Sequence, residues 1–474
     1  MGRSKRPDGR SPRPAERATA RRDSPAPSPS DRFFAAFRDA IEGFATAGEI
    51  PRCVVAFSGG LDSTLLLTAL TRLGLRPPPR AVHVDHGLHP DSASWARHCA
   101  DVARALGVQL TVERVSVDGA SGFGLEAAAR DARYRALADS LAPGEVLLTA
   151  HHADDQLETV LLRLLRGAGI RGMRGIGELT PFGRGLLARP LLAFTRAELR
   201  AQAAALGLSW LEDPANRDLR HDRNFLRARV VPELLARWPA AAGAAVRFAQ
   251  AASDAEAILE AVAAEDLARC DDAGRLPRAV VAALAPPRQR NLLREALRRV
   301  GLPPASAARL EALRFALLHA GPRSRPCVRW PGGEGRVFRE HLYLMAPLPP
   351  ASPLGDRALL HDHTVWSGPE GSLSFESADA AAGLPGSWLD AGLTLKFRVG
   401  GERFHALGST RERPLKDWLH EAAILPWMRD RVPLLYRGES LVAVADLCFA
   451  AAVGAADAHE PRWRVAWTSH AAVR

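Results

Sequence analysis

The sequence has no long apolar runs and no closely spaced cysteine pairs, and it contains very little lysine. No run approaches the eighteen or so apolar residues of a membrane span, which excludes a transmembrane protein. The five cysteines are scattered and never form a C-x-x-C pair, so the sequence favours a reducing cytoplasm over a disulfide framework or a zinc site. Only three lysines stand beside sixty arginines, which we interpret as compositional bias. What is present is length, because 474 residues predict two or three domains.

The formal charge of +10 indicates a polyanionic partner, but its distribution along the chain is uneven. In the first thirty residues, eight Lys or Arg face three Asp or Glu, so this segment carries +5 of the +10. It also holds six prolines and five serines. Residues 1–31 are therefore predicted to be a disordered basic tail. A solvated bacterial tail fits the prolines better than the alternative, a transit peptide.

The remaining chain divides by pattern into three parts. Residues 32–230 alternate Val- and Leu-rich runs with helical patterns, which predicts an α/β domain with a Rossmann-like, doubly wound parallel sheet. Residues 231–345 are Ala- and Leu-rich at helical spacing and end in a hairpin near Gly332, which indicates a mostly helical domain. A Pro-rich linker precedes a small α+β domain at 354–474. The strands expected in the first domain are Cys53–Phe57, Ala81–Val84, Leu110–Val115 and Val146–Ala150.

A glycine turn directly follows the first expected strand and precedes a helical run. Its residues are Ser58, Gly59, Gly60, Leu61, Asp62 and Ser63. The glycines permit a sharp turn and close approach of a ligand, and the helix directs unpaired N–H groups at the same point. We expect phosphate there, with Asp62 as a ligand of Mg²⁺. No lysine follows the glycines, so this is not a Walker A loop; the alternative is a plain strand-to-helix turn.

A second polar motif follows the fourth expected strand, at residues 151–159, and a shorter one, residues 83–88, follows the second strand. On a helix, Asp155 and Glu158 share a face while Asp154 points elsewhere, and two adjacent carboxylates bind a cation. An ammonium group beside the phosphate is one candidate for that cation. The alternatives are an acidic first turn that suits the helix dipole and a His/Asp metal site. A cleft shared with the glycine turn is the simplest interpretation.

These motifs resemble a known family. The segment S-G-G-L-D-S is similar to the pyrophosphate-binding loop of the N-type ATP pyrophosphatases. With H-V-D-H-G-L, L-E-A-A-A-R-D-A-R-Y and H-H-A-D-D-Q-L-E-T, it resembles the tRNA(Ile)-lysidine synthase family in its three-domain form. R-P-L-L, D-P-A-N, R-N-F-L-R and L-K-F-R-V-G-G-E-R-F extend the resemblance over nearly the whole chain beyond residue 32. Two departures are His89, where the family often has Arg, and Ala215, where Ser is usual.

The resemblance implies a ligase that uses ATP and Mg²⁺. It would adenylate C2 of the wobble cytidine in a tRNA(Ile) with a CAU anticodon, release pyrophosphate, and join free L-lysine to give lysidine. Asp155 and Glu158 would bind the lysine, and Asp62 would be catalytic. A cation must also offset charge on the phosphoryl group; Arg130 and Arg133 are candidates, and the resemblance favours Arg130. The base that deprotonates the lysine stays open between His151, His152 and other groups.

Contacts to tRNA are expected from basic side chains, with plain surface solvation as the alternative for each. The candidates are Arg171, Arg174, Arg223, Arg227, Lys396, Arg398 and Arg403. One rival interpretation is a tRNA thiolase, which the lack of C-x-x-C disfavours. Another is a non-catalytic RNA-binding protein with a decayed ATP loop, which the intact motifs oppose. The sequence does not determine the oligomeric state, and a homodimer is one option.

Overall fold

The computed structural model describes residue 2 and residues 28–45, 50–117, 125–212, 218–321, 324–350, 358–361, 365–378, 383–456 and 460–471. Nearly all of the predicted basic tail and the segment Asp213–Asn216 lie outside the described residues. The chain divides into two compact units, Met1–Glu256 and Ala257–Arg474, and the boundary falls within helix α10 (Ala241–Leu267). In the part of the chain that the structure describes, no helix combines the length and apolarity needed to cross a membrane.

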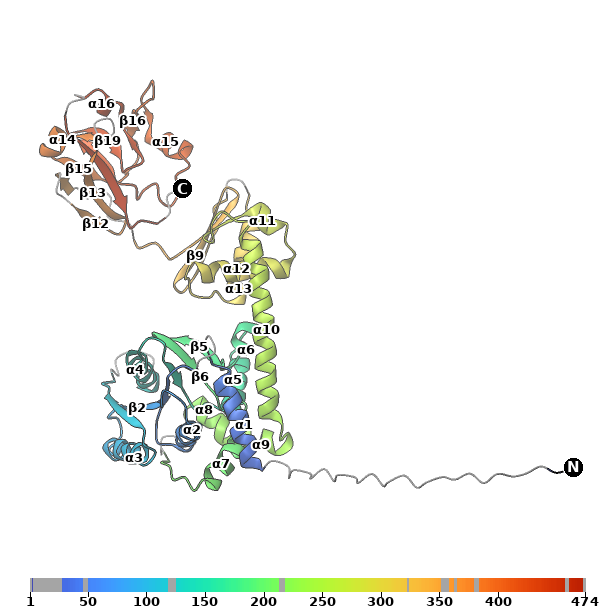
Figure 1. The fold of residues 1–474 in the computed structure, drawn as a ribbon. Coiled ribbons are helices and arrows are strands. Elements are labelled where there is room, and N and C mark those ends of the chain that lie inside the picture. Colours follow the sequence, from blue (N-terminus) through green and yellow to red (C-terminus); the bar gives the residue numbers. More distant parts are fainter. Residues whose placement is uncertain are drawn as a thin grey trace. The chain divides into compact units, whose positions relative to one another are not determined.

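The first unit is built on a six-stranded sheet with the order β3-β2-β1-β4-β6-β5 (Figure 1). All neighbouring strands pair in parallel except the edge strand β5, which is antiparallel to β6. This arrangement confirms the predicted doubly wound sheet. The strands are β1 (Cys53–Ala56), β2 (Arg80–Asp85), β3 (Gln109–Arg114), β4 (Val146–Leu148), β5 (Leu179–Phe182) and β6 (Gly185–Ala188).

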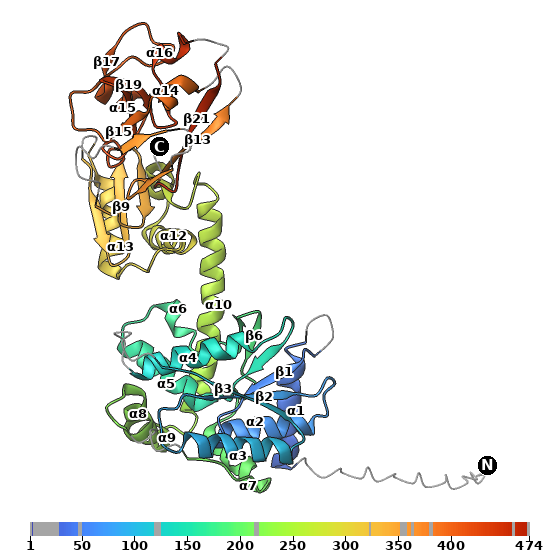
Figure 2. The same ribbon diagram turned by 90° about the vertical axis from the view of Figure 1, so that its left-hand side faces the viewer.

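Helices cover both faces of this sheet. In Figure 2, α4 lies on one side and α2 and α3 lie on the other. Phe37, Leu66 and Leu199 pack with strand residues on the α2 side, and Leu137 and Leu141 do so on the α4 side. The helices are α1 (Pro29–Glu42), α2 (Leu61–Arg72), α3 (Ser92–Ala105), α4 (Leu125–Asp139), α5 (Ala153–Leu165), α6 (Ile170–Met173), α7 (Arg196–Ala205), α8 (Asp222–Phe225), the π-helix η2 (Leu226–Val230) and α9 (Val231–Arg237).

The strand order places the two motifs together. Strands β1 and β4 are neighbours, with Val55 opposite Leu148. Because they are parallel, both end at the same edge of the sheet, and that edge is where ligands bind in open α/β folds. Helix α2 starts at this edge after β1, and α5 starts there after β4. The glycine turn and the acidic helix therefore face one region, as the sequence predicts.

The second unit begins with the end of α10, which is followed in the described residues by three further helices and a four-stranded sheet of order β7-β10-β9-β8. Leu292, Leu293 and Leu313 from the helices pack against Val337 and Leu342 of the sheet. The hairpin expected near Gly332 is confirmed by the antiparallel pairing of β8 with β9. The elements are β7 (Arg275–Pro277), α11 (Arg278–Ala282), α12 (Pro286–Arg299), α13 (Ala307–His319), β8 (Cys327–Trp330), β9 (Gly333–Phe338) and β10 (His341–Met345).

The rest of the second unit packs a five-stranded sheet, β11-β15-β18-β19-β20, against a four-stranded one, β12-β13-β21-β14. Leu395 and Leu435 of the first sheet meet Leu373 and Val465 of the second in one core. The elements are β11 (Ala358–Leu360), β12 (Trp366–Gly368), β13 (Gly371–Ala378), β14 (Leu384–Pro385), α14 (Gly386–Asp390), β15 (Leu393–Lys396), β16 (Arg403–Phe404), β17 (Arg413–Pro414), α15 (Leu415–Glu421), β18 (Leu434–Arg437), β19 (Ser440–Val444), β20 (Cys448–Phe449), α16 (Ala451–Gly454) and β21 (Arg462–Thr468). This agrees with the predicted small α+β region.

Candidate active site

The turn between β1 and α2 requires glycine at its second residue, Gly59. Gly59 has φ +79°, in the left-handed region, and a Cβ added there would lie 2.9 Å from the Sγ of Cys99. Gly60 is extended and forms the N-cap of α2 without a side chain. The Gly59 carbonyl accepts a hydrogen bond from the backbone N–H of Leu211 at 2.9 Å, which fixes the turn from outside. The backbone is thus held open toward a ligand at a helix N-terminus.

Two serine hydroxyls close the turn without any charged group. The Oγ atoms of Ser58 and Ser63 lie 3.0 Å apart. Ser63 also donates to the Gly60 carbonyl at 3.1 Å, and the Gly60 N–H donates to Ser58 Oγ at 3.4 Å. These neutral contacts are individually weak, so the hydroxyls and N–H groups can be redirected to a phosphate at small cost.

Asp62 supplies the only carboxylate of the turn, and it is incompletely paired. Its Oδ1 is buried and has no hydrogen-bond partner among the described residues. Its Oδ2 lies 3.7 Å from Nε2 of His152. Burial raises the pKa of Asp62 and nearby Asp155 adds to the rise, whereas His152 opposes it. A buried, unpaired carboxylate oxygen beside a phosphate-binding turn fits a hard cation such as Mg²⁺.

The first turn of α5 separates its carboxylates as predicted. Asp154 Oδ2 accepts a hydrogen bond from the backbone N–H of Arg196 at 2.8 Å, at the start of α7. Asp155 Oδ2 accepts from the N–H of His152 at 3.1 Å and so caps its own helix. Asp155 and Glu158 share the opposite face, where the side chain of Glu158 is only 1% exposed.

Two arginines from α8 and η2 bind this carboxylate pair. Arg223 donates from Nε to Glu158 Oε2 at 2.8 Å and from Nη2 to Asp155 Oδ1 at 3.1 Å. Arg227 donates from Nε to Glu158 Oε1 at 2.7 Å and from Nη2 to Asp155 Oδ1 at 2.9 Å. From the sequence, both arginines are expected to contact tRNA. Their pairing with Asp155 and Glu158 is not predictable from the sequence, because they follow these residues by 65 to 72 positions.

The charges around Asp155 keep it ionised. Burial alone would raise the pKa of this carboxyl. The neighbouring His152 and the guanidinium groups of Arg223 and Arg227 outweigh burial, so the pKa of Asp155 lies below its ordinary value. Asp155 is therefore an ionised carboxylate that binds cations at neutral pH.

His151 differs from His152 in its surroundings. Burial is the main cause that lowers the pKa of His151 to about 4, so this imidazole is neutral at physiological pH. Its Nδ1 lies 2.9 Å from the hydroxyl of Thr149. His152, in contrast, is enclosed by carboxylates, with Asp155 Oδ2 at 3.5 Å and Asp154 Oδ2 at 3.8 Å.

Arg130 and Arg133 both lie on α4, with exposed side chains. The guanidinium of Arg130 lies 5.0 Å from the ring centroid of Tyr134. Arg130 contributes to the lowered pKa of His151 after burial, and Arg133 contributes after burial to that of His86. The charge of Arg130 therefore reaches His151, two residues before α5 begins.

The other basic residues proposed as tRNA contacts differ in how far carboxylates engage them. Arg171 is more than half exposed and lies 3.9 Å from Glu256. Arg398 pairs with Asp430 at 2.9 Å, and Arg403 pairs with Glu412 at 2.9 Å. The remaining two are Arg174, whose charge lowers the pKa of Arg163 after burial, and Lys396, whose Nζ lies 4.5 Å from the ring centroid of Tyr436.

The second unit contains a basic cluster that the sequence did not predict. Burial and the charges of Arg325, Arg398 and Arg339 together lower the pKa of Arg429. Arg429 donates to the carbonyl of Ile424 at 2.9 Å. Asp430, which pairs with Arg398, opposes them. The four arginines come from separate segments of the chain, so no local pattern indicates that their charges act on one another.

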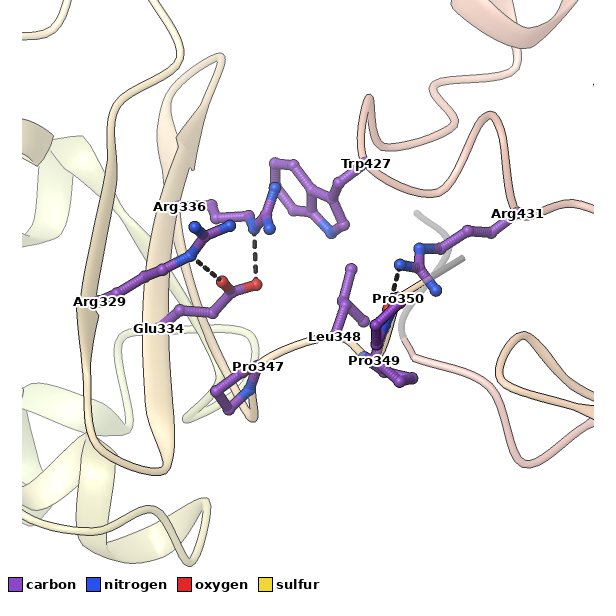
Figure 3. A pocket seen from close by; sticks show the side chains of 9 residues that line it. All are labelled: Arg329, Glu334, Arg336, Pro347, Leu348, Pro349, Pro350, Trp427 and Arg431. Carbon is purple, nitrogen blue, oxygen red and sulfur yellow. Dashed lines mark hydrogen bonds and ion pairs between the residues drawn. The ribbon is translucent and has the colours of Figure 1, made fainter. Parts of the chain in front are cut away.

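A cleft of about 560 Å³ lies in the same unit and combines basic and aromatic side chains (Figure 3). Arg329 and Arg336 both donate to Glu334, at 3.1 and 2.7 Å. The guanidinium of Arg336 lies 5.3 Å from the ring centroid of Trp427. Arg431 faces these residues across the cleft and donates to the carbonyl of Pro349. Three cations against one carboxylate give this cleft a positive balance.

Comparison with known proteins assigns the chain. Residues 35–234 match the PP-loop domain model, 276–343 the TilS substrate binding domain and 393–467 the TilS substrate C-terminal domain. The tRNA(Ile)-lysidine synthase of Alkalilimnicola ehrlichii is 47% identical over 85% of this chain and 91% of its own. Those of Methylococcus capsulatus and Yersinia pseudotuberculosis are 38% and 37% identical over 80% and 90% of this chain and 88% and 97% of their own. The chain belongs to the tRNA(Ile)-lysidine synthase family.

Membership of the tRNA(Ile)-lysidine synthase family confirms the fold class, the use of ATP and the enzyme class, an ATP-dependent ligase of tRNA modification. The two cysteines of the first unit also give no support to the rival thiolase interpretation. Burial raises the pKa of both Cys53 and Cys99 to about 12, so neither is a thiolate at neutral pH. His89, where the family often has Arg, stacks its ring on that of Trp95, with 4.7 Å between the ring centroids. This difference from the family pattern is therefore local. Ala215 lies outside the described residues.

Proposed function

We propose that this chain joins free L-lysine to C2 of the wobble cytidine of a tRNA(Ile) with a CAU anticodon, through an adenylated cytidine. The observation that carries the proposal is the shared sheet edge. There the phosphate-binding turn after β1 faces a buried carboxylate pair after β4. One motif suits the pyrophosphate that ATP loses, and the other suits the ammonium group of lysine.

In the first step, the C2 oxygen of the cytidine attacks the α-phosphate of ATP, and pyrophosphate leaves. The N–H groups and hydroxyls of residues 58–63 would hold the departing phosphates. Asp62 would hold Mg²⁺, which offsets their charge when bound. Among the described residues, no cluster of three or more His, Cys, Asp or Glu side chains could hold a metal. Arg130 would add positive charge near the phosphoryl group.

In the second step, the lysine Nε attacks C2, the bond from C2 to the adenylate oxygen breaks, and AMP leaves. Asp155 and Glu158 would recognise the ammonium form, but the attacking amine must first lose a proton. Burial lowers the pKa of His151 to about 4, so this imidazole is neutral but only a weak base for an ammonium proton. The base therefore stays open between His151, His152 and other groups.

The tRNA body would be bound by the second unit. Its basic cluster, Arg325, Arg339, Arg398 and Arg429, suits phosphate contacts. The cleft with Arg336 and Trp427 suits a base or a ribose beside a phosphate, because aromatic and guanidinium planes stack on bases. These contacts would distinguish the substrate from other tRNAs with the same anticodon.

The decisive assay mixes the full chain, radiolabelled lysine, ATP and unmodified tRNA(Ile) with a CAU anticodon. We expect label in the tRNA together with equimolar AMP and pyrophosphate. A matched tRNA with uridine in place of the wobble cytidine should accept no label. Cleavage of ATP with no lysine in the tRNA would contradict the proposal and favour a different nucleophile.

A further inference from the structure

The carboxylates assigned to lysine are already bound by cations of the chain itself. Glu158 accepts three hydrogen bonds, one at Oε1 and two at Oε2, all from guanidinium groups. Asp155 Oδ1 accepts two more from the same groups. Each carboxylate has about four acceptor positions. An ammonium group that enters this site therefore meets carboxylates whose favourable positions are largely taken.

Both arginines approach from the solvent side of the site. Their side chains are 31% and 28% exposed, against 11% for Asp155 and 1% for Glu158. They lie four residues apart, on the four-residue helix α8 and on the π-helix η2. A π-helical turn is rare and is frequent at functional sites. Neither arginine belongs to the sheet or to the long helices that support the site.

Arg223 is held less firmly than Arg227. Arg227 makes three hydrogen bonds to the pair. Its Nη2 bridges the two carboxylates, because it donates to both Asp155 Oδ1 and Glu158 Oε2. Arg223 makes two, and the longer is 3.1 Å. If Arg223 leaves, Arg227 still contacts both Asp155 and Glu158, so neither carboxylate loses all of its charge partners.

An ammonium group cannot simply be added to this arrangement. Beside both guanidinium groups it would be the third cation facing two carboxylates, and like charges at contact distance repel strongly in a half-buried site. If it takes the place of Arg223, the count of two cations and two anions is kept. The released guanidinium lies at the solvent side, where water hydrates it.

From these contacts we infer that Arg223 is a resident counter-ion of the lysine site, which the substrate ammonium displaces when it binds Asp155 and Glu158. This inference rests on the proposed function. Arg223 is thus a positioning residue that keeps the carboxylates neutralised and sets the affinity for lysine. Lysine binding is an exchange of one cation for another, and the competition weakens it.

The test measures the KM for lysine at saturating ATP and tRNA in the full chain. Arg223→Ala should lower this KM by roughly three- to tenfold, the size expected for loss of one partly exposed charge pair. Arg223→Lys should bring the KM back toward the wild-type value, since it restores a competing cation. Arg220→Ala is the matched control: its partner Asp218 lies outside the site, and the KM for lysine should not change.

Thermal unfolding of each variant separates folding from binding, and Arg223→Gln replaces Arg223→Ala if the latter does not fold. An unchanged or raised KM for lysine in a folded Arg223 variant would overturn the inference. It would show that Arg223 is a fixed part of the site. Failure of the wild-type chain to incorporate lysine is a different result, because it would refute the proposed function itself.

Discussion

The glycine turn and the start of α5 lie at the same sheet edge but are built in opposite ways. The turn is closed by neutral hydrogen bonds between Ser58, Ser63 and Gly60, and its one carboxylate keeps an unpaired buried oxygen. The start of α5 holds two carboxylates that are satisfied by two arginines. One motif is held by weak contacts and the other by strong ones.

The difference follows from the charge that each motif receives. A site for an anion can be made of backbone N–H groups and hydroxyls, which need no counter-charge of their own. A site for a cation needs carboxylates, and buried carboxylates are costly unless a cation pairs with them. The fold therefore supplies arginines to α5 and supplies only geometry to the turn. Substitutions in the turn should accordingly affect rate, and substitutions on α5 should affect lysine use and stability together.

The largest effect is expected at the turn. Gly59→Ala places a Cβ at φ +79° and 2.9 Å from Cys99 Sγ, so the turn must shift. A displacement of this kind should lower ATP-dependent pyrophosphate release by about 100-fold or more. Gly74→Ala is the control: Gly74 follows the other end of α2, has φ +64°, and its added Cβ meets nothing within 4 Å. Equal losses in both variants would show general unfolding instead of damage to the turn.

Next in size is the effect at α5. Glu158→Gln leaves two guanidinium groups facing Asp155 as their one remaining buried carboxylate, so the free energy of unfolding should fall by about 3 kcal/mol. The KM for lysine should rise by at least tenfold, about 1.4 kcal/mol of binding, while pyrophosphate release changes less.

Glu295→Gln is the matched control for this variant. Glu295 is 5% exposed and pairs with Arg298 and Arg299 on α12, in the other unit. Its loss should destabilise the protein similarly and leave the KM for lysine unchanged. A rise of KM in both variants would remove Glu158 from the lysine site.

A smaller effect is expected from pH. The pKa of His151 is about 4 in the folded protein, below its ordinary value of 6.5, and burial is the main cause. Between these values the unfolded chain binds more protons than the folded one, so stability rises with pH and falls on acidification. The free energy of unfolding should fall by about 2 kcal/mol less between pH 6.5 and pH 4 in His151→Gln than in the wild type. Urea unfolding at both pH values measures this difference. Parallel pH profiles for both proteins would contradict the lowered pKa.

The smallest effect is expected in the second unit, where the described arginines meet no buried carboxylate pair like that of α5. Arg429→Ala should weaken tRNA binding by a few-fold and reduce the salt slope of the affinity by about one. Arg464→Ala is the control, because Arg464 is exposed and paired with Glu376. Equal effects of the two variants would show that the cluster around Arg429 has no special role.

Much of this site follows from local sequence. The strand, the glycine pair and the helix after it are one continuous pattern, so both the turn and its position at the strand end are predictable. The helical period alone puts Asp155 and Glu158 on one face and Asp154 on another, as observed. The parallel sheet rule then brings both motifs to one edge.

The parts that were not predictable depend on distant segments. Arg223 and Arg227 stand in a segment whose helices are four and five residues long, with no pattern that points at α5. Their contact with Glu158 is a result of how the chain returns to the sheet edge after α7. The charge of Arg325 likewise acts on Arg429 only because the second unit folds. Ion pairs between distant segments leave no periodic signal in sequence.

The most direct test is an experimental structure of the protein with a non-hydrolysable ATP analogue, Mg²⁺ and L-lysine. We expect the β- and γ-phosphates to lie at residues 58–63. The lysine ammonium should be hydrogen-bonded to Asp155 and Glu158, and Arg223 should be displaced from them. Lysine bound elsewhere, with both arginines still on these carboxylates, would contradict this expectation.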